Sequence, residues 1–518
     1  MTQQVAQLLP VRHRFDTGPH GVPVRADHRP RLSPGLLEGS AWLALAVIVT
    51  ATAAVSASGD YRRANALLGI CCCLLGIRIF VGHGGHRLTT VSIFGFAFAI
   101  FFGVGGVYHA ILTLDFIQPW LWQSLLFGFV AQVILFFGFW NRRTTHEDDS
   151  AGLLDFSPGT RFGVAAAGMA VLLAAVAATA GGTTSEQLQN LILGAAFAAV
   201  TLTAAALVLD PNAKALSWRT LYIGAQFVVF VQYVHGGTGR LVVATLGLTI
   251  AALYAIRFRT RAIKIGIVLT TAPVLYWMAR ERLSYLDRLA VDGSYGRTGL
   301  ESAVRPPHAF AELLYHYQTY GFEVAGGRTF FSIPALLIPE SIWADKPIAL
   351  GYELARITAP ERMGTGYSDA SSMLGEWFFN FGYPGLVAML LVVGIAVRLL
   401  DRQMSTMLRI RLGPARLLGI VAAVIISAGI PDLLWSGTHT YGARALLRLP
   451  VILLLVVVVS VLAAGAGGTH RYPGSARTVP LTTPGRRHGA TRRAQPHARA
   501  AAWNANPWRS PFDRGSTR

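Results

Sequence analysis

Long apolar runs recur from about residue 41 to about residue 466, and they constrain the fold more than any other feature of the chain. Most runs are close to the 20 residues that an α-helix needs to cross a bilayer core. Only 14% of the 518 residues are charged, against roughly 25% in soluble domains. The sequence therefore predicts an all-α, polytopic helical membrane protein.

We count about twelve transmembrane helices in the apolar part of the chain. Their expected bounds are 41–58, 64–81, 88–108, 118–140, 162–181, 190–209, 219–234, 241–256, 263–279, 377–399, 417–435 and 447–466. Helices one to nine thus occupy 41–279, and helices ten to twelve occupy 377–466. Between them lies one large extracytoplasmic loop, 280–376, here named the outer loop. The basic tails 1–40 and 467–518 have compositions typical of disordered, cytoplasmic segments.

The positive charges set the expected orientation. Lys and Arg gather in alternate short loops, as in 142–161, 257–264 and 402–416, whereas the intervening loops are poor in them. By the positive-inside rule, we expect the protein to lie in the cytoplasmic membrane with both termini in the cytoplasm and the outer loop facing outward. This distribution accounts for the net charge of +19 without a nucleic-acid partner. The polybasic tails also suit contact with anionic membrane lipid.

Arg240 is the first candidate functional residue. It closes the glycine-rich turn 235–240 and begins the eighth expected helix at its outer end. Free N–H groups at a helix N-terminus, together with a guanidinium group, can bind a phosphate or another oxyanion. The alternative is an arginine that extends to the membrane interface.

Glu376 and Asn380 form the second candidate, in the stretch 371–382. Ser371 or Ser372 can cap a helix that starts near Met373, which would place Glu376 in its first turn. Four residues separate Glu376 from Asn380, so the two share a helix face. Partial desolvation at the membrane boundary would suit Glu376 to general-base work. The alternative is a carboxylate that merely stabilises the helix start.

Trp343, Asp345 and Lys346 form the third candidate, within 340–347 of the outer loop. An aromatic face beside charged groups is a plausible sugar-binding pattern, but Trp is equally typical of an interface anchor. Arg328, after two glycines, is a candidate second phosphate contact. The stretch 307–322 predicts an amphipathic helix suited to the interface.

Other polar residues give weaker patterns. His308 in the outer loop is expected to be solvated. Asp432, near the outer end of the eleventh expected helix, is an exceptional acidic residue in an apolar run. The consecutive residues Cys71–Cys73 have neither a disulfide nor a metal-site spacing. We expect no metal and no cofactor.

Several motifs of the outer loop and its flanks resemble those of the Wzy-like family of O-antigen and oligosaccharide repeat-unit polymerases. The similar segments are Gly327-Arg328-Thr329, then Pro339-Glu340-Ser341-Ile342-Trp343-Ala344-Asp345-Lys346-Pro347, then Gly351-Tyr352-Glu353, and finally the run from Ser372 through Gly375-Glu376 and Asn380 to Gly382. The turn 237–240 is similar to a Gly-Ser-Arg turn of that family, with one glycine inserted before the arginine.

The resemblance implies an enzyme that polymerises polysaccharide on the outer face of the membrane. Its substrates would be oligosaccharide repeat units linked to polyprenyl pyrophosphate, and its protein partners a flippase and a chain-length regulator. Arg240 would neutralise the pyrophosphate leaving group without a metal. Glu376, or Asp345 in its place, would act as the base. Arg328, Trp343, Lys346, Asn380 and Tyr352 would bind substrate.

Two other classes stay open. One is a related outer-face transferase, such as an O-antigen ligase-like enzyme or a single-sugar transferase. The other is a polysaccharide transporter or flippase, for which charged or helix-breaking residues are expected within the spans.

Overall fold

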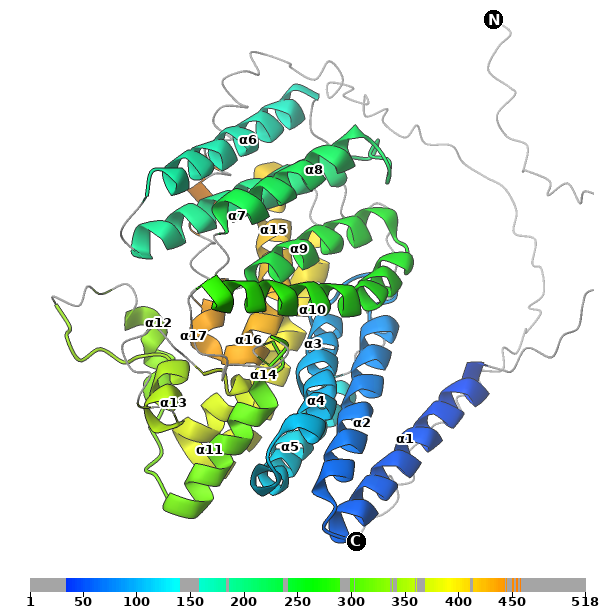
Figure 1. Cartoon of the computed structure of the whole chain (residues 1–518). Coiled ribbons are helices and arrows are strands. Elements are labelled where there is room, and N and C mark those ends of the chain that lie inside the picture. Colours follow the sequence, from blue (N-terminus) through cyan, green and yellow to red (C-terminus); the bar gives the residue numbers. More distant parts are fainter. Residues whose placement is uncertain are drawn as a thin grey trace, which may run out of the picture. The chain divides into compact units, whose positions relative to one another are not determined.

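The computed structural model describes residues 34–139, 158–182, 186–235, 241–288, 299–301, 303–335, 338, 342–358, 360, 369–409, 413–442, 444, 450, 453–454 and 457. These residues all belong to one unit, 1–466. Their regular elements are helices, with no β-strand among the described ranges (Figure 1). The expected tail 467–518 and most of the twelfth expected helix lie outside the described residues.

Seven of the described helical segments are long and apolar enough to cross a membrane. They are Tyr61–Gly82, Thr90–Leu112, Pro158–Ala180, Leu191–Val208, Leu241–Phe258, Ser372–Thr406 and Leu417–Ser436. The segments Trp42–Ala57 and Ala262–Trp277 are shorter apolar helices. The chain is thus a helical protein of the membrane-embedded type, and the count of twelve spans stays a prediction.

The helices follow the predicted apolar runs closely, except that the first begins at Pro34, within the segment 1–40 that was predicted to be a disordered tail. In the first half they are α1 (Pro34–Ala57), α2 (Tyr61–Gly82), α3 (Thr90–Phe98), the π-helix η1 (Ala99–Val104), α4 (Gly105–Leu112), the 3-10 turn η2 (Asp115–Ile117), α5 (Gln118–Phe139), α6 (Pro158–Ala180) and α7 (Glu186–Val208). The next are α8 (Trp218–Val229), the π-helix η4 (Phe230–Val234), α9 (Leu241–Phe258) and α10 (Ala262–Arg288). α10 extends beyond the expected end of the ninth span at 279.

The outer loop and the last spans contain further helices. They are α11 (Pro306–Tyr320), the 3-10 turn η5 (Arg328–Phe331), α12 (Ser332–Ala335), α13 (Leu350–Thr358), α14 (Ser372–Arg409), α15 (Gly413–Ala428), α16 (Ile430–Ser436) and α17 (Thr438–Tyr441). Helical structure is interrupted at two glycines: α14 bends at Gly382 (φ 65°, ψ −152°), and Gly429 separates α15 from α16.

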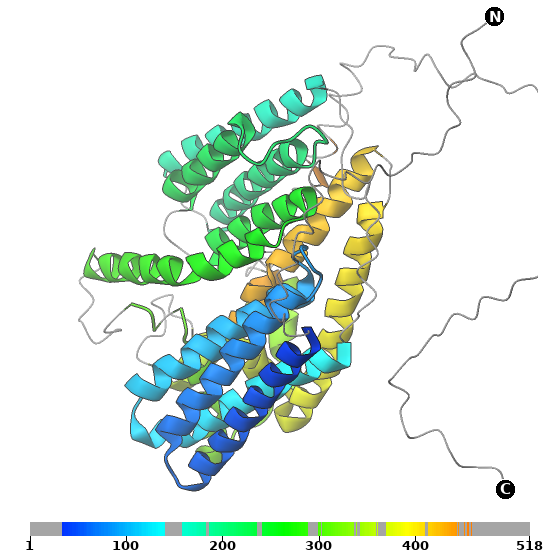
Figure 2. The same ribbon diagram turned by 90° about the vertical axis from the view of Figure 1, so that its right-hand side faces the viewer.

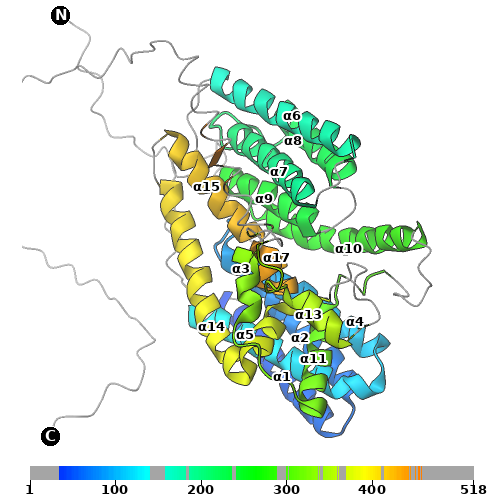
Figure 3. The same ribbon diagram turned by 90° about the vertical axis from the view of Figure 1, so that its left-hand side faces the viewer.

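Small residues allow α2 to pack closely against the continuous α3–η1–α4 segment (Figure 2). A Cβ atom on Gly76 would lie 2.4 Å from the carbonyl oxygen of Gly95, and one on Gly69 would lie 2.8 Å from the amide nitrogen of Val107. Close backbone approach through small residues is the usual way in which membrane helices associate. Elsewhere α6 packs on α7, and α14 runs beside α15 (Figure 3).

The predicted helix at 307–322 is confirmed as α11, but its apolar face does not serve a membrane interface. Phe310, Leu313 and Leu314 are fully buried, and α11 packs on α5 and α14. The aromatic and aliphatic spacing thus reflects a protein core. The outer loop is tied to the spans by this helix rather than lying apart from them.

Candidate functional site

Glu376 lies where the outer loop enters α14. The helix starts at Ser372, and the Ser372 hydroxyl oxygen accepts a hydrogen bond of 3.3 Å from the Gly375 N–H, so the predicted serine cap of a helix that begins near Met373 is confirmed. Glu376 is consequently just beyond the first turn, which contains no acidic residue. The expected placement in that turn is wrong because the helix begins at Ser372.

The Glu376 carboxylate is fully buried and accepts three hydrogen bonds. Oε1 accepts from the hydroxyls of Thr438 (2.8 Å) and Thr329 (3.2 Å), and Oε2 accepts from the Thr438 N–H (2.6 Å). These donors come from two segments that are 47 and 62 residues away along the chain. Uncharged donors, rather than a cation, therefore hold this buried carboxylate.

Asn380 completes the network on the same helix face, as predicted from the four-residue spacing. Its Nδ2 donates to the Thr329 hydroxyl and to the Glu376 carbonyl oxygen, each at 2.7 Å, and it is fully buried. Its Oδ1 also accepts from the Thr329 N–H at 3.3 Å, so Asn380 orients Thr329 in this structure.

The bend at Gly382 explains how the outer loop attaches to this helix. A helix end leaves its last carbonyl groups without intrahelical partners. Here the carbonyl oxygens of Phe379 and Asn380 accept from the N–H groups of Ala325 (3.1 Å) and Gly326 (2.9 Å). The left-handed Gly327 (φ 91°) then turns the chain so that Thr329 reaches Glu376.

Gly437 brings Thr438 against the carboxylate from the other side. It has φ 86°, and a Cβ atom there would lie 2.4 Å from Glu376 Oε2. Only glycine fits both the backbone conformation and the close approach. The next residue, His439, has its Nδ1 atom 2.7 Å from the Ser332 hydroxyl. Burial, and then the nearby charge of Arg444, lower the pKa of His439 below its ordinary value.

Asp432, singled out in the sequence, is buried on α16 beside this network. Its Oδ1 accepts from Arg444 Nη1 at 2.8 Å, and its Oδ2 lacks a hydrogen-bond partner within the described part of the chain. Arg444 is three-quarters buried at its side chain. The acidic exception in the apolar run is thus matched by an arginine twelve residues later.

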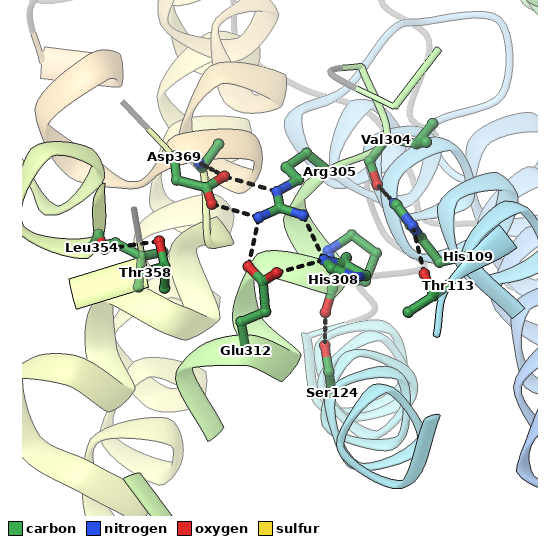
Figure 4. Close-up of polar contacts among 12 residues, drawn as sticks. His109, Thr113, Ser124, Val304, Arg305, His308, Glu312, Leu354, Thr358 and Asp369 are labelled. Carbon is green, nitrogen blue, oxygen red and sulfur yellow. Dashed lines mark hydrogen bonds and ion pairs between the residues drawn. The ribbon is translucent and has the colours of Figure 1, made fainter. Parts of the chain in front are cut away.

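A second polar cluster holds the chain that leads into α14 (Figure 4). Arg305 binds both carboxylate oxygens of Asp369 with one edge of its guanidinium group, through Nε to Oδ1 (2.9 Å) and Nη2 to Oδ2 (2.7 Å). The same Nη2 lies 2.5 Å from Glu312 Oε2. Two parallel bonds of this kind give a defined geometry, so Arg305 positions the residues that precede Glu376.

His308 belongs to this cluster, and the expectation that it is solvated is wrong. Its ring lies 4.8 Å from that of His109, and its Nδ1 lies 2.5 Å from Arg305 Nη1. Burial, then the charges of Arg305 and His109, lower the pKa of His308 well below its ordinary value. The sequence pattern of α11 could not show which of its polar residues are covered by α4.

The other predicted site residues lie in more open surroundings. Arg328 is half-exposed, and its Nη2 is 3.9 Å from Glu353 Oε1. Trp343 and Tyr352 are about 40% exposed, at 38% and 41%. Asp345 is also exposed, and Lys346 Nζ donates to the Ile338 carbonyl oxygen at 3.4 Å. Arg240 lies outside the described residues.

The structure thus brings Glu376, Asn380 and Thr329 together and adds partners that sequence reasoning missed. These are Thr438, Ser332, His439, Arg305 and Asp369. The only available signals were the glycine before Thr438 and the pair of charges in the loop. Within the described ranges, no group of three or more His, Cys, Asp or Glu side chains is arranged to hold a metal ion.

Comparison of the chain with protein-family models, with curated proteins and with solved structures found no match.

Proposed function

We propose that the protein is a membrane glycan polymerase that joins oligosaccharide repeat units linked to polyprenyl pyrophosphate on the outer face of the cytoplasmic membrane. The observation that carries the proposal is the fully buried Glu376, held by Thr329 and Thr438 at the start of a long apolar helix. An ionisable group buried at the end of a membrane span is expensive to keep, and such groups are typically functional.

In this reaction Glu376 is the general base. It takes the proton of an acceptor hydroxyl at the non-reducing end of one repeat unit. The acceptor oxygen forms a bond to the anomeric carbon of the growing glycan as that carbon's bond to pyrophosphate breaks. The polyprenyl pyrophosphate leaves as an anion, whose charge Arg240 neutralises, with Arg328 as a second contact.

The hydrogen bonds to Glu376 indicate how an acceptor would reach it. Both carboxylate oxygens are occupied, Oε2 by a main-chain N–H and Oε1 by two hydroxyls. An acceptor hydroxyl can replace the Thr438 hydroxyl at Oε1 with little change in hydrogen-bond energy, because one hydroxyl donor replaces another. The short helix α17, which starts at Thr438, would have to shift to admit it.

The exposed residues of the outer loop supply the sugar-binding surface in this proposal. Trp343 offers a half-exposed aromatic face, and Tyr352 offers another. Lys346 and Asp345 provide charged groups for hydroxyls, and Asp345 is the alternative base. Their exposure supports a role in contacting substrate, since none needs to be uncovered first.

A transporter or flippase is the second candidate, favoured by two features of the spans. α14 is interrupted at Gly382, and interrupted helices are typical of transporter binding sites. Lys264 is fully buried and donates to the His83 carbonyl oxygen at 2.6 Å, while the nearly buried Asp401 accepts from the N–H groups of Thr90 (2.5 Å) and Val91 (3.3 Å). An outer-face ligase-like transferase remains the alternative within the enzyme class.

Arg240→Ala and Glu376→Gln, expressed in cells that lack the native protein, test the proposal. Each variant is expected to abolish chain elongation while single repeat units still reach the outer face. Long glycans from both variants would contradict the assigned site. Repeat units that accumulate inside the cell would instead favour the transporter.

A further inference from the structure

A large apolar crevice opens between α2, the α3–η1–α4 segment and α10. Its volume is about 720 Å³, which is within the range of ligand pockets. Cys73 and Ile77 of α2 form one wall, and Ala99 and Ile100 of η1 form the next. The residues of α10 from Val268 to Arg280 complete it.

The crevice is unusual because α10 covers it only partly. α10 meets α2 and α9 over short stretches, and its side chains Leu269 and Tyr276 are 71% exposed. The π-helix η1 supplies the opposite wall, and π-bulges occur frequently at functional sites. A long, flexible chain can therefore enter from the side and continue out of the crevice.

The crevice lining is mainly apolar, with Cys73 and Thr271 along its length and with Tyr108 and the charged Arg280 at one end. Ile100, Val104 and Tyr108 follow one another along one wall, and Val268, Ala272 and Arg280 along the other. The Tyr108 hydroxyl donates to the Glu301 carboxylate. Arg280 is exposed. Among the described lining residues, Arg280 is the one cation. This gradient fits an amphiphile with a hydrocarbon chain and an anionic head.

The chain connects the polar end of the crevice to the Arg305 cluster. Leu300 lines the crevice, and four residues later the Val304 carbonyl oxygen lies 3.0 Å from His109 Nε2 of α4. Arg305 follows and binds Asp369, which precedes Glu376 by seven residues. A head group held at Arg280 would share the crevice with Leu300, four residues before Val304 in the chain.

We propose that this crevice binds the hydrocarbon chain of a polyprenyl phosphate, and that Arg280 binds the phosphate attached to it. The choice of this chain over another rests on the proposed function, whereas the crevice and its cation do not. The chain enters from the bilayer between α2 and α10, which leaves the sugar end free to face the outer loop.

Photolabelling of the full-length protein in lipid nanodiscs tests the site. The probe is a polyprenyl phosphate with a diazirine in the chain, and labelled peptides are identified by mass spectrometry. We expect labels on α2, η1 and α10. Unlabelled polyprenyl phosphate should compete, and polyprenol, which lacks the phosphate, should compete about tenfold less well.

Two pairs of variants provide matched controls. Ala272→Trp fills the crevice from an exposed position and should lower labelling about tenfold, whereas Leu269→Trp, on the same helix outside the crevice, should not. Arg280→Gln should lower labelling about tenfold, and Arg280→Lys should retain most of it, because the charge stays.

Three results would overturn the inference: labels on other helices, equal loss from Ala272→Trp and Leu269→Trp, or equal competition by phosphatidylglycerol. Binding is measured without an acceptor, so it does not require polymerisation. Labelling as expected by a protein that never elongates glycans would support the crevice and contradict the proposed function. Elongation without labelling of the crevice would support the proposed function and contradict the binding of the polyprenyl chain in the crevice.

Discussion

Glu376 and Asp210 are both fully buried carboxylates, yet their partners differ completely. Asp210, after α7, binds two arginines: Arg219 Nη1 lies 2.5 Å from its Oδ2, and Arg161 binds the same oxygen. Among the residues that the structure describes, the donors to Glu376 are threonine hydroxyls and one main-chain N–H. The Asp210 region balances charge with charge, and the Glu376 region does not.

The difference separates a structural carboxylate from one suited to proton transfer. Burial alone would raise the pKa of Asp210, but the Asn212 N–H, Arg219 and Arg161 lower it below its ordinary value. Arg257 also donates to the Asp210 carbonyl oxygen at 2.9 Å. Arg161, Arg219 and Arg257 thus connect the ends of α6, α8 and α9 to Asp210 at the end of α7. A carboxylate held in this way stays ionised and connects helices. Glu376, without a cation, can exchange its proton with a substrate.

The largest expected effect is that of Glu376→Gln on elongation. The new amide can place its oxygen toward the Thr438 N–H and its NH2 toward hydroxyls that can turn to accept, so the fold should persist. If Glu376 is the base, as proposed, its loss should slow elongation by about 10²- to 10⁴-fold. Glycan length on gels, with thermal unfolding as a check, measures both. A large fall in unfolding temperature without loss of activity would show that Glu376 is a structural carboxylate and not a base.

Asp210→Asn should have the opposite outcome. Its NH2 group would face the guanidinium groups of Arg161 and Arg219, which leaves two largely buried cations without their anion. Breaking a buried ion pair from one side costs about 3–5 kcal/mol of stability. Thermal unfolding of the purified protein should show this loss, while elongation by the protein that remains folded should be close to normal.

Gly437→Ala should strain the Glu376 region by a smaller amount. The added methyl would lie 2.4 Å from Glu376 Oε2 at a positive φ, and such backbone strain costs about 1–3 kcal/mol. Gly224→Ala in α8 is the control, because a Cβ atom there meets nothing within 4 Å. We expect only the first change to lower stability and elongation together. Equal behaviour of the two variants would show that the contact with Glu376 does not matter.

The smallest effect concerns acid. The pKa of His439 is lowered by burial and by Arg444, from an ordinary value of 6.5. When α17 shifts away and exposes His439, the pKa of His439 returns to its ordinary value. As the pH falls below about 6.5, His439 is therefore protonated more readily in the shifted state than in the packed state, and the packed position of α17 becomes less stable. The pKa of Asp210 is lowered, so its contribution to folding stability is fully present at pH values above 3.8, its ordinary pKa. That contribution is lost as the pH falls from 3.8 through the lower pKa of the folded state.

Hydrogen exchange between pH 7 and pH 5 can compare the two regions. Exchange in 438–441, normalised for the intrinsic pH dependence of exchange, should quicken, and exchange in 210–213 should not. His439→Gln should remove the change in 438–441. A change of equal size in both segments would show that acid loosens the protein as a whole.

Sequence reasoning placed the helices well because apolar runs of membrane length leave few other arrangements. It also placed Glu376 and Asn380 on one face, because that relation depends only on helical periodicity. It failed for His308, which packs against His109 of α4, about 200 residues away in the chain. It missed Thr438 for the same reason.

What the sequence determined by itself is thus the local part: apolar helices, a polar loop, and a carboxylate near the start of a span. Only the tertiary structure decided which partners each buried charge has. Hydrogen bonds and ion pairs join atoms at about 3 Å, and periodicity says nothing about contacts 62 residues apart, such as that of Thr438 with Glu376. For that reason Asp210 and Glu376, alike in the sequence as single acidic residues at helix ends, are distinguished by the fold alone.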